Sequence, residues 1–379
     1  MRIKRLYVWM VIVPLLLSAC GGKDPIVEVP PPPPIDKTGD DTGTGDNTGT
    51  GDSGKENDGP KPWDENRGKE VHPSAGNGWT VTKVDDGIVY YAFDGKESVT
   101  NANQRIYVTD IDLNNTSYSV KLGYYSSTTT ASKVFKGTGA IACINGGYEK
   151  AALYLKVNGS VISNISADTI GDTGVPQWKS EAAVYLNQDR DVRIEFTGKD
   201  MNLAQWRAVY RERATKENTF ITSAPMLIDD FEPVGEDFCA KHPKSAYLDK
   251  NGKDNNSENP YNHQGSNTNP RTALAKTENN HLLFIVVDGR RSGISTGISA
   301  ANLTKFLVNN FNPQYAINLD GGGSSTMCVE GQGDPTTHVV NYPTDNMSST
   351  GKDGSPKESG GPDHAGERPR DTFFYVVRK

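Results

Sequence analysis

The sequence is poor in cysteine, and its cysteines and histidines form no familiar metal-binding pattern. Only four cysteines occur in 379 residues, and none are spaced as Cys-x-x-Cys, which argues against a zinc–cysteine site. The six histidines show no His-Glu-x-x-His spacing. Apart from Cys20, the cysteines are Cys143, Cys239 and Cys328, so an exported chain would hold at most one internal disulfide and a leftover thiol. No metal or other cofactor is expected.

Long apolar runs are missing after the first twenty residues, so no later segment is a candidate membrane span. Residues 1–20, "MRIKRLYVWMVIVPLLLSAC", have a basic start and a short apolar run, as in an export signal. Their ending in Leu-Ser-Ala-Cys resembles a bacterial lipoprotein signal. We therefore expect a lipid on Cys20 that anchors the protein to a membrane of the cell envelope, at the outer membrane or cell surface. The alternative is an ordinary signal peptide that contains a cysteine.

Residues 21–76 have almost nothing to bury, because a proline run is followed by near-repeats of Gly, Asp and Thr. Such a composition predicts a disordered tether. Residues 23–70 carry twelve acidic and six basic side chains, so most of the net charge of −7 lies in this linker. That acidity argues against a nucleic acid as partner. A single folded domain is expected over residues 77–379, as a monomer.

The expected domain reads mostly as strands. Residues 87–95, 105–113 and 118–126 are rich in β-branched and aromatic side chains, and Asn158-Gly159 within 151–163 is a strong hairpin signal. Helical patterns are few: one runs from Ser299 to about Asn310, and a short one covers 201–209. This balance predicts the α+β class, with a mixed or antiparallel sheet and a few helices.

Four short islands stand out: "CINGGY" (143–148), "PRTALA" (270–275), "VVDGRRSGIS" (286–295) and "INLDGGGSSTM" (317–327). In three of them an apolar strand ends at a polar residue that is followed by glycine. Polar side chains at strand ends, beside small residues, form the rim of a pocket. Three glycines in a row cost conformational entropy. We interpret Gly321, Gly322 and Gly323 as the place where a ligand comes close to the backbone; a tight turn is the plainer alternative.

The islands, in this order, resemble the phosphodiester glycosidase family, and the resemblance covers most of residues 80–379. "NLDGGGSSTM" is close to a signature by itself, and "NYP" (341–343) and Arg368 in "ERPRDTFFYVV" match the family's closing segment. Two positions depart from the pattern: Glu149 follows "NGGY" where the family has an aromatic residue, and Arg370 follows Arg368-Pro369. The departures bear on substrate preference more than on the fold.

The resemblance implies hydrolysis of a sugar joined through its anomeric oxygen to a phosphodiester, here an N-acetylglucosamine-like sugar in a surface or environmental glycan. Asp320 is the first candidate for the catalytic carboxylate and Asp288 the second. Arg271 and Arg368 offer bidentate donors suited to phosphate. The remaining candidate contacts to phosphate or sugar are Asn145, Gly146, Thr272, Arg290, Gly321, Gly322, Gly323, Ser324, Ser325 and Thr326.

Each assignment has a structural alternative. Asp288-Gly289 and Asp320-Gly321 are also typical turn pairs. Arg271 fits an ion pair, Arg290 and Arg291 fit a solvated loop, and Asn145 fits a left-handed turn. At the level of function, the alternatives are a glycan-binding lipoprotein without turnover and a phosphodiesterase that cleaves the P–O bond.

Two long polar segments, 241–270 and about 342–367, each lie next to an island, and we interpret them as lids over the site. The histidines of the late segment, His338 and His364, are in reach of such a site. Residues 249–257 hold side-chain oxygens suited to calcium, but they lack the final glutamate of an EF-hand, and disorder is the favoured interpretation.

Overall fold

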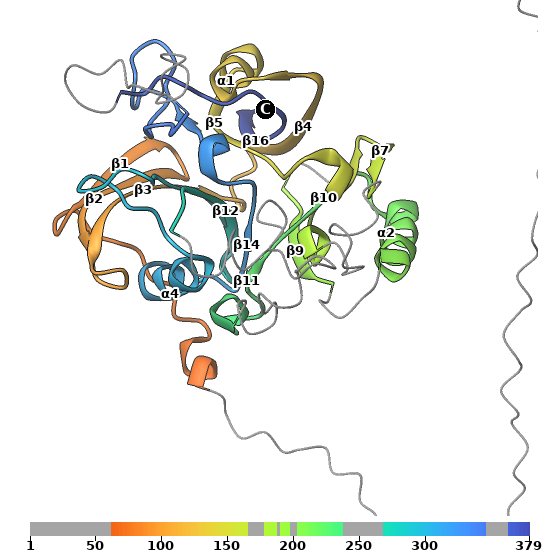
Figure 1. Cartoon of the computed structure of the whole chain (residues 1–379), viewed down its shortest axis with the longest axis horizontal. Helices are drawn as coiled ribbons and strands as arrows, with labels where there is room; N and C mark the ends of the chain where they lie inside the picture. The colour runs from red at the N-terminus through yellow and green to blue at the C-terminus, as the bar shows by residue number, and fades with distance from the viewer. Residues whose placement is uncertain (1–61, 166–177, 188–189, 198–202, 238–267, 346–362) are drawn as a thin grey trace, which may run out of the picture. The chain divides into compact units, whose positions relative to one another are not determined.

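The computed structural model describes residues 62–165, 178–187, 190–197, 203–237, 268–345 and 363–379 (Figure 1). These residues form sixteen strands in three sheets and three α-helices, and all strand pairings within the sheets are antiparallel. The strand-rich α+β class is therefore confirmed. The leader with Cys20, the linker up to residue 61, Cys239 and the calcium candidate 249–257 lie outside the described residues.

The largest sheet has seven strands, and several islands meet at one end of three neighbouring strands. In spatial order its strands are β1 (Trp79–Asp85), β2 (Ile88–Glu97), β3 (Ala102–Asp112), β13 (His281–Val287), β12 (Arg271–Lys276), β14 (Tyr315–Asn318) and β11 (Met226–Ile228). Arg271 pairs with Val287, and Ala273 pairs with Asn318. The start of β12 and the ends of β13 and β14 therefore lie side by side. Asp288 directly follows β13, and Asp320 follows β14 by two residues.

A four-stranded sheet brings the first island to the same place. Its strands, in spatial order, are β15 (Met327–Val329), β5 (Ala140–Asn145), β16 (Arg370–Arg378) and β4 (Tyr118–Thr129). Met327 lies opposite Ile144, and Phe373 lies opposite Asn145. The end of β5, the hydroxyl-rich loop before β15 and the start of β16 are therefore neighbours.

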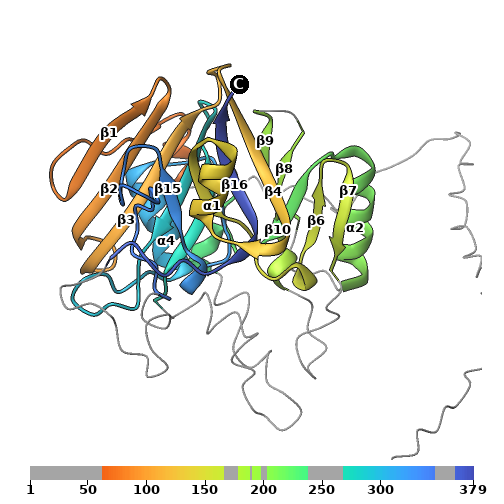
Figure 2. The ribbon, with the colours of Figure 1, turned by 90° about the horizontal axis from the view of Figure 1, so that it is seen from above.

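The third sheet has five strands and carries a helix. Its strands, in spatial order, are β7 (Ser160–Asn164), β6 (Tyr154–Val157), β10 (Phe220–Ser223), β8 (Ala182–Leu186) and β9 (Val192–Phe196). Figure 2 shows β1–β3 and helix α2 (Leu203–Lys216) on opposite sides of β4 and β16. The predicted hairpin is confirmed: β6 and β7 are joined by Asn158 and Gly159 with φ of 48° and 81°, the backbone that an Asn-Gly pair favours.

The predicted helix at 299–310 is confirmed as α4 (Ala300–Asn310). The Ser299 side chain caps it by accepting a hydrogen bond from the Asn302 amide at 3.2 Å. Its apolar stripe of Leu303, Phe306 and Leu307 packs on one face of the seven-stranded sheet. The opposite face of this sheet packs on the other two sheets. Both faces of β13 are consequently buried, which explains its uninterrupted apolar sequence.

The other helices were less visible in the sequence. Helix α2 extends well beyond the predicted 201–209, of which 201 and 202 lie outside the described residues. Helix α1 (Ala131–Thr138) was not predicted, since it has only two turns and follows a row of threonines. It ends at Gly139, whose left-handed backbone (φ 65°) terminates the helix. No helix among the described residues is long and apolar enough to cross a membrane.

The packed part of the chain begins before residue 77, where the sequence placed the start of the domain. A 3₁₀ turn covers Pro62–Asn66, and the amide of Asn312 donates to the carbonyl oxygens of Asn66 and Lys69 at 2.6 and 2.9 Å. Arg67 forms an ion pair with Asp230 at 2.9 Å. The end of the expected linker is thus fastened to the seven-stranded sheet.

Two of the cysteines lie side by side in the core. Cys143 of β5 and Cys328 of β15 are direct cross-strand partners, and both are buried free thiols. Burial raises the pKa of each thiol well above its usual range.

We expect Phe284→Ala, in the central strand β13, to lower the free energy of unfolding by about 3–5 kcal/mol, because the truncation leaves a cavity in the core. Val161→Ala is the control: its side chain is 51% exposed, so a change below about 0.5 kcal/mol is expected. Urea denaturation measures both. Equal losses in the two variants would contradict this description of the core.

Candidate functional site

The amide of Asn145 joins three of the four islands. Its Oδ1 accepts hydrogen bonds from the Thr272 hydroxyl at 2.8 Å and from the Thr326 amide at 3.1 Å. Its Nδ2 donates to the Asp320 carbonyl oxygen at 2.7 Å. Asn145 is 1% exposed and ends β5 without a left-handed backbone, so the turn alternative for it is wrong. Its side chain holds the loop that follows β14 in place.

Asp320 is a largely buried carboxylate that faces an arginine. Its side chain is 16% exposed, and Oδ2 lies 3.1 Å from Nη2 of Arg370. Burial raises the pKa of Asp320, while the Arg370 guanidinium and the Ser324 hydroxyl act in the opposite direction. Arg370 also donates to the Gly147 carbonyl oxygen at 3.3 Å. Arg370 therefore favours the ionised form of a carboxylate that would otherwise resist ionisation.

Several polar atoms around this carboxylate have no partner among the described residues. They are buried, and they comprise the hydroxyls of Thr326 and Thr372 and the Nε of Arg370. Thr372 borders the site because its side chain lies against Gly146. Buried polar groups without hydrogen bonds cost free energy. Their concentration next to Asp320 marks a place prepared for a polar ligand or for water.

The three glycines are approached by the protein itself. A Cβ on Gly321 would lie 2.7 Å from the Pro270 carbonyl oxygen, and one on Gly322 would lie 3.1 Å from Nη2 of Arg290. A Cβ on Gly323 would collide with Asp345 and Arg368. Gly322 also has a φ of +63°. The glycines therefore leave room for Pro270, just before β12, and for two arginines to pack against the loop. We had expected a ligand to make this close approach.

Two guanidinium groups flank the glycine loop. Arg368 donates through Nε and Nη2 to both oxygens of Asp345, at 2.6 and 3.0 Å, and its side chain is 42% exposed. Arg290 donates to the Asn269 side chain at 3.0 Å. Burial and the nearby Arg368 lower the pKa of Arg290. This mutual repulsion, compensated in part by Asp345, makes the flank of the loop attractive to an anion.

Arg271 lies inside the protein. It is 2% exposed, its Nε donates to the Ile298 carbonyl oxygen at 2.8 Å, and burial lowers its pKa to about 10. Thr272, next along β12, is fully buried and also reaches the Ser325 hydroxyl at 3.2 Å. The "RTA" island thus supports the loop from beneath.

Asp288 is directed toward a different segment from Asp320. It is 2% exposed and accepts hydrogen bonds from the Tyr107 hydroxyl, the Asn341 side chain and the Tyr342 amide, each at 3.1 Å. Burial raises its pKa to about 7 despite these donors. Asn341 in turn donates to the Ser325 carbonyl oxygen at 2.9 Å. Asp288 therefore fixes the "NYP" segment and, through it, the hydroxyl loop.

Three residues around the site were not among the candidates. Arg370 had been noted only as a departure from the family pattern, Asp345 closely follows "NYP", and Asn341 lies within it. For Arg370 and Asn341, a charged or amide residue inside a quoted motif was the available signal, whereas Asp345 lies two residues beyond "NYP". Glu149, taken as simply exposed, is 53% exposed but pairs with buried Lys179 at 2.5 Å.

Of the two late histidines, His364 stacks on Tyr342 with a centroid distance of 4.4 Å. The ring nitrogen Nδ1 of His338 accepts a hydrogen bond from the Gly331 amide at 3.2 Å. The proposed lids fall largely outside the described residues, which omit 238–267 and 346–362.

Replacing Arg370 by Gln should raise the pKa of the Asp320 carboxyl, because the cation that favours its ionised form is lost. Carbon-13 NMR of the aspartate carboxyl groups over a pH titration measures the shift. Arg378→Gln, which removes an arginine paired with Asp85 and Glu330 instead, should leave Asp320 unchanged. An unaltered Asp320 pKa in Arg370→Gln would contradict the pairing.

Asp288 should make the protein less stable as the pH rises. Its carboxyl titrates near 3.8 when unfolded and about 7 when folded, so the folded state binds more protons in that window. The free energy of unfolding should fall across it, by at most about 1.4 kcal/mol per pH unit. In Asp288→Asn this contribution disappears. Chemical denaturation at a series of pH values tests it, and identical slopes for the two proteins would refute it.

Comparison with known proteins gives a family match. The family model described as phosphodiester glycosidase matches residues 138–352, which include all four islands. No functionally curated protein matches the sequence.

Three solved structures are similar at low identity. One is the catalytic domain of zebrafish N-acetylglucosamine-1-phosphodiester alpha-N-acetylglucosaminidase, auto-inhibited by its pro-peptide, with 16% identity, a TM-score of 0.49, and coverage of 82% of this chain and 87% of that one. A hypothetical protein from Synechocystis has 12% identity and a TM-score of 0.47, covering 80% and 64% of the respective chains. A putative exported protein from Burkholderia pseudomallei has 13% identity and a TM-score of 0.45, covering 73% and 74%. The family model spans more than half of the sequence, and the chain therefore belongs to the phosphodiester glycosidase family.

Proposed function

We propose that this protein hydrolyses glycosyl phosphodiesters at the bond between the anomeric carbon and the phosphate oxygen. The observation that carries the proposal is the largely buried Asp320 carboxylate, paired with Arg370 and close to the hydroxyls of Thr326 and Thr372, which have no partner in the described parts of the chain. An anionic carboxylate beside unoccupied hydrogen-bonding groups suits a sugar ring that develops positive charge. The family membership supports the same class of reaction.

Asp320 is the group that acts on the anomeric carbon. As the C–O bond breaks, an ionised carboxylate stabilises the oxocarbenium-like ring or forms a bond to it, and water completes the hydrolysis. The products are the free sugar and a phosphomonoester. A phosphate leaves without strong protonation, so the reaction does not require a second carboxylate as general acid. This fits the orientation of Asp288, which accepts hydrogen bonds from Asn341 and Tyr342 of "NYP".

The phosphate is placed at the flank of the glycine loop. Arg290 and Arg368 converge on Gly322 and Gly323, and Asp345 pairs with Arg368. A phosphodiester anion there would relieve the repulsion between the two guanidinium groups and accept charge-assisted hydrogen bonds. Buried Arg271 contributes positive potential from beneath the loop.

The proposal also names the substrate and the place of the protein in the cell. We take the sugar to be N-acetylglucosamine-like and the substrate to be a surface or environmental glycan, in line with the resemblance of the motifs. The basic, apolar leader ending at Cys20 supports a lipid-anchored protein of the cell envelope.

The test uses UDP-N-acetylglucosamine and a methyl ester of N-acetylglucosamine 1-phosphate, with release of free N-acetylglucosamine as the readout. Asp320→Asn should lower the rate at least about 100-fold, because the neutral amide cannot stabilise the developing charge. Asp94→Asn, which alters an aspartate with a 67% exposed side chain, should keep the wild-type rate. Equal rates in wild type and Asp320→Asn would exclude Asp320 from the chemistry. Binding of both compounds without any release would favour a glycan-binding protein.

A further inference from the structure

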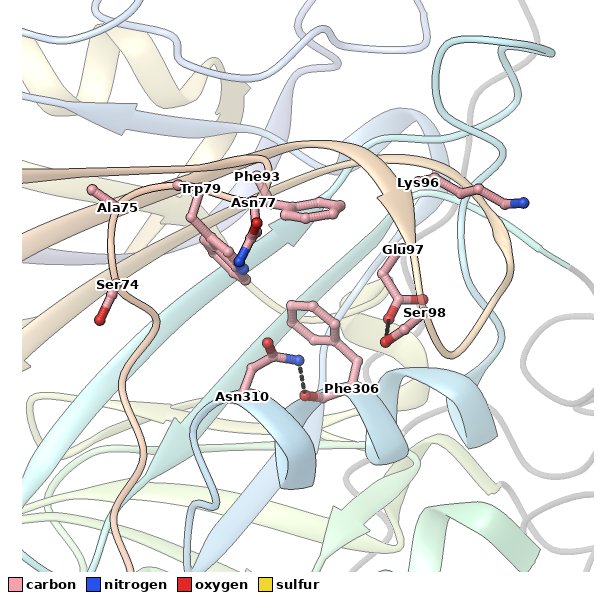
Figure 3. A pocket seen from close by; sticks show the side chains of 11 residues that line it. Ser74, Ala75, Asn77, Trp79, Phe93, Lys96, Glu97, Ser98, Phe306 and Asn310 are labelled. Carbon is pink, nitrogen blue, oxygen red and sulfur yellow. Dashed lines mark hydrogen bonds between the residues drawn. The ribbon is translucent and has the colours of Figure 1, made fainter.

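A hollow lies on the seven-stranded sheet and shares no residue with the four islands. Its volume is about 350 Å³, and it is bounded by residues 74–77 before β1, by the end of β2 and by helix α4 (Figure 3). We call it the Trp79 pocket. Its lining side chains include Ser74, Asn77, Trp79, Phe93, Glu97 and Phe306.

Aromatic rings form one side of the Trp79 pocket. Trp79 lies 5.2 Å from Phe93 and 6.1 Å from Phe306 between ring centroids, and Figure 3 shows the three rings gathered around the hollow. Phe93 and Phe306 are 7% and 1% exposed, whereas Trp79 is half-buried. Tyr91 and Phe311 support Trp79 by edge contacts. The indole is therefore held rigidly while part of it still reaches solvent.

Polar groups face the aromatic side. The side chains of Ser74 and Asn77 make no hydrogen bond to any residue that the structure describes. Asn77 is held by its backbone, since reciprocal hydrogen bonds of 2.9 Å between Gly76 and Trp79 close a turn around it. Asn310 uses its Nδ2 to reach the Phe306 carbonyl oxygen at 2.9 Å, which leaves its Oδ1 available.

The third wall is a fixed turn. Glu97 is 3% exposed, and its two oxygens accept the amides of Val99 at 2.8 Å and Thr100 at 2.7 Å. Both carboxylate oxygens thus accept hydrogen bonds within the turn. This wall shapes the pocket, and we do not expect it to bind a cation. The only other charged side chain in the lining, Lys96, is exposed and points away in Figure 3. The pocket therefore has one aromatic side and one amide and hydroxyl side, next to a carboxylate whose oxygens already accept hydrogen bonds.

We infer that the Trp79 pocket is a second saccharide-binding subsite, which takes one neutral pyranose unit. A pyranose has an apolar C–H face and an equatorial rim of hydroxyls. The face would pack on the Trp79 indole, and the hydroxyls would bond to Asn77, Asn310 and Ser74. Pockets of a few hundred Å³ with aromatic walls and a few placed polar groups are typical of small-ligand sites. This goes beyond the proposed hydrolysis, because binding here requires no chemistry.

A second saccharide site would change how the protein engages a polymer. A glycan held at the Trp79 pocket presents its remaining units at a raised local concentration to any other site on the same domain. A phosphodiester of a single sugar has no second pyranose to place in the Trp79 pocket and would gain nothing. The subsite therefore affects polymeric ligands only.

The test follows the Trp79 indole N–H by NMR during titration with the trisaccharides of N-acetylglucosamine, glucose (β-1,4) and glucose (α-1,4). The chain has five tryptophans, and the Trp79 signal is assigned by its absence from the spectrum of Trp79→Phe. At least one trisaccharide should shift this signal, with a Kd on the order of 1 mM. Asn77→Asp, which keeps a residue that tolerates the φ of 50°, removes an amide donor and should weaken binding about tenfold.

Two controls separate this subsite from the proposed active site. Asp320→Asn should bind at the Trp79 pocket as the wild type does, and Trp79→Phe should retain hydrolysis of the small phosphodiester. The inference is overturned if no trisaccharide moves the Trp79 signal, or if Asn77→Asp binds like the wild type. Binding at Trp79 without any hydrolysis would uphold the inference while rejecting the proposed function.

Discussion

The site depends on one side-chain amide that joins two sheets. Asn145 ends β5 of the four-stranded sheet, Thr272 begins β12 of the seven-stranded sheet, and the loop from Asp320 to Thr326 passes between them. The amide bonds to all three at 2.7–3.1 Å, in a place where no solvent replaces a lost partner. Asn145 thus binds both ends of the loop, while Thr272 and Asn341 hold it at Ser325.

Charged side chains lie close together at the site, and their arrangement underlies the proposed chemistry. Burial raises the pKa of Asp320, and Arg370 acts in the opposite direction from a distance of 3.1 Å. Among the described residues, Asp345 pairs with Arg368 and also lies near Arg290. Among the described residues, two guanidinium groups at the glycine loop thus lie close to the Asp320 carboxylate, and this arrangement matches a substrate with an anionic phosphate and a sugar that becomes cationic.

The sequence predicted those features that depend on local patterns. The α4 helix follows from its apolar stripe and serine cap, the β6–β7 hairpin from Asn-Gly, and the meeting of the four motifs from their places at strand ends. The features that it missed depend on register and on side-chain direction. Arg370 reaches Asp320 only because β16 pairs with β5 in one register. Asp288 looked equivalent to Asp320 as an Asp-Gly pair after a strand, yet its carboxylate points to Asn341 and Tyr342.

The glycine triplet is another feature whose role could not be predicted from the sequence alone. Three glycines in a row correctly indicated a close approach to the backbone, but no sequence pattern distinguishes a ligand from a neighbouring strand or arginine. Two of the neighbours, Pro270 and Arg290, come from other islands, and Asp345 follows "NYP". Their packing against the loop also explains why these motifs occur together.

The most direct test of the central claim is the position of an oxygen-18 label after hydrolysis of the methyl ester of N-acetylglucosamine 1-phosphate in labelled water. Mass spectrometry of the two products locates the atom that water contributed. Attack at the anomeric carbon, assisted by Asp320, predicts the label in the sugar and none in the phosphomonoester. Label in the phosphate would mean cleavage of the P–O bond and would contradict the assignment of Asp320 to the anomeric carbon.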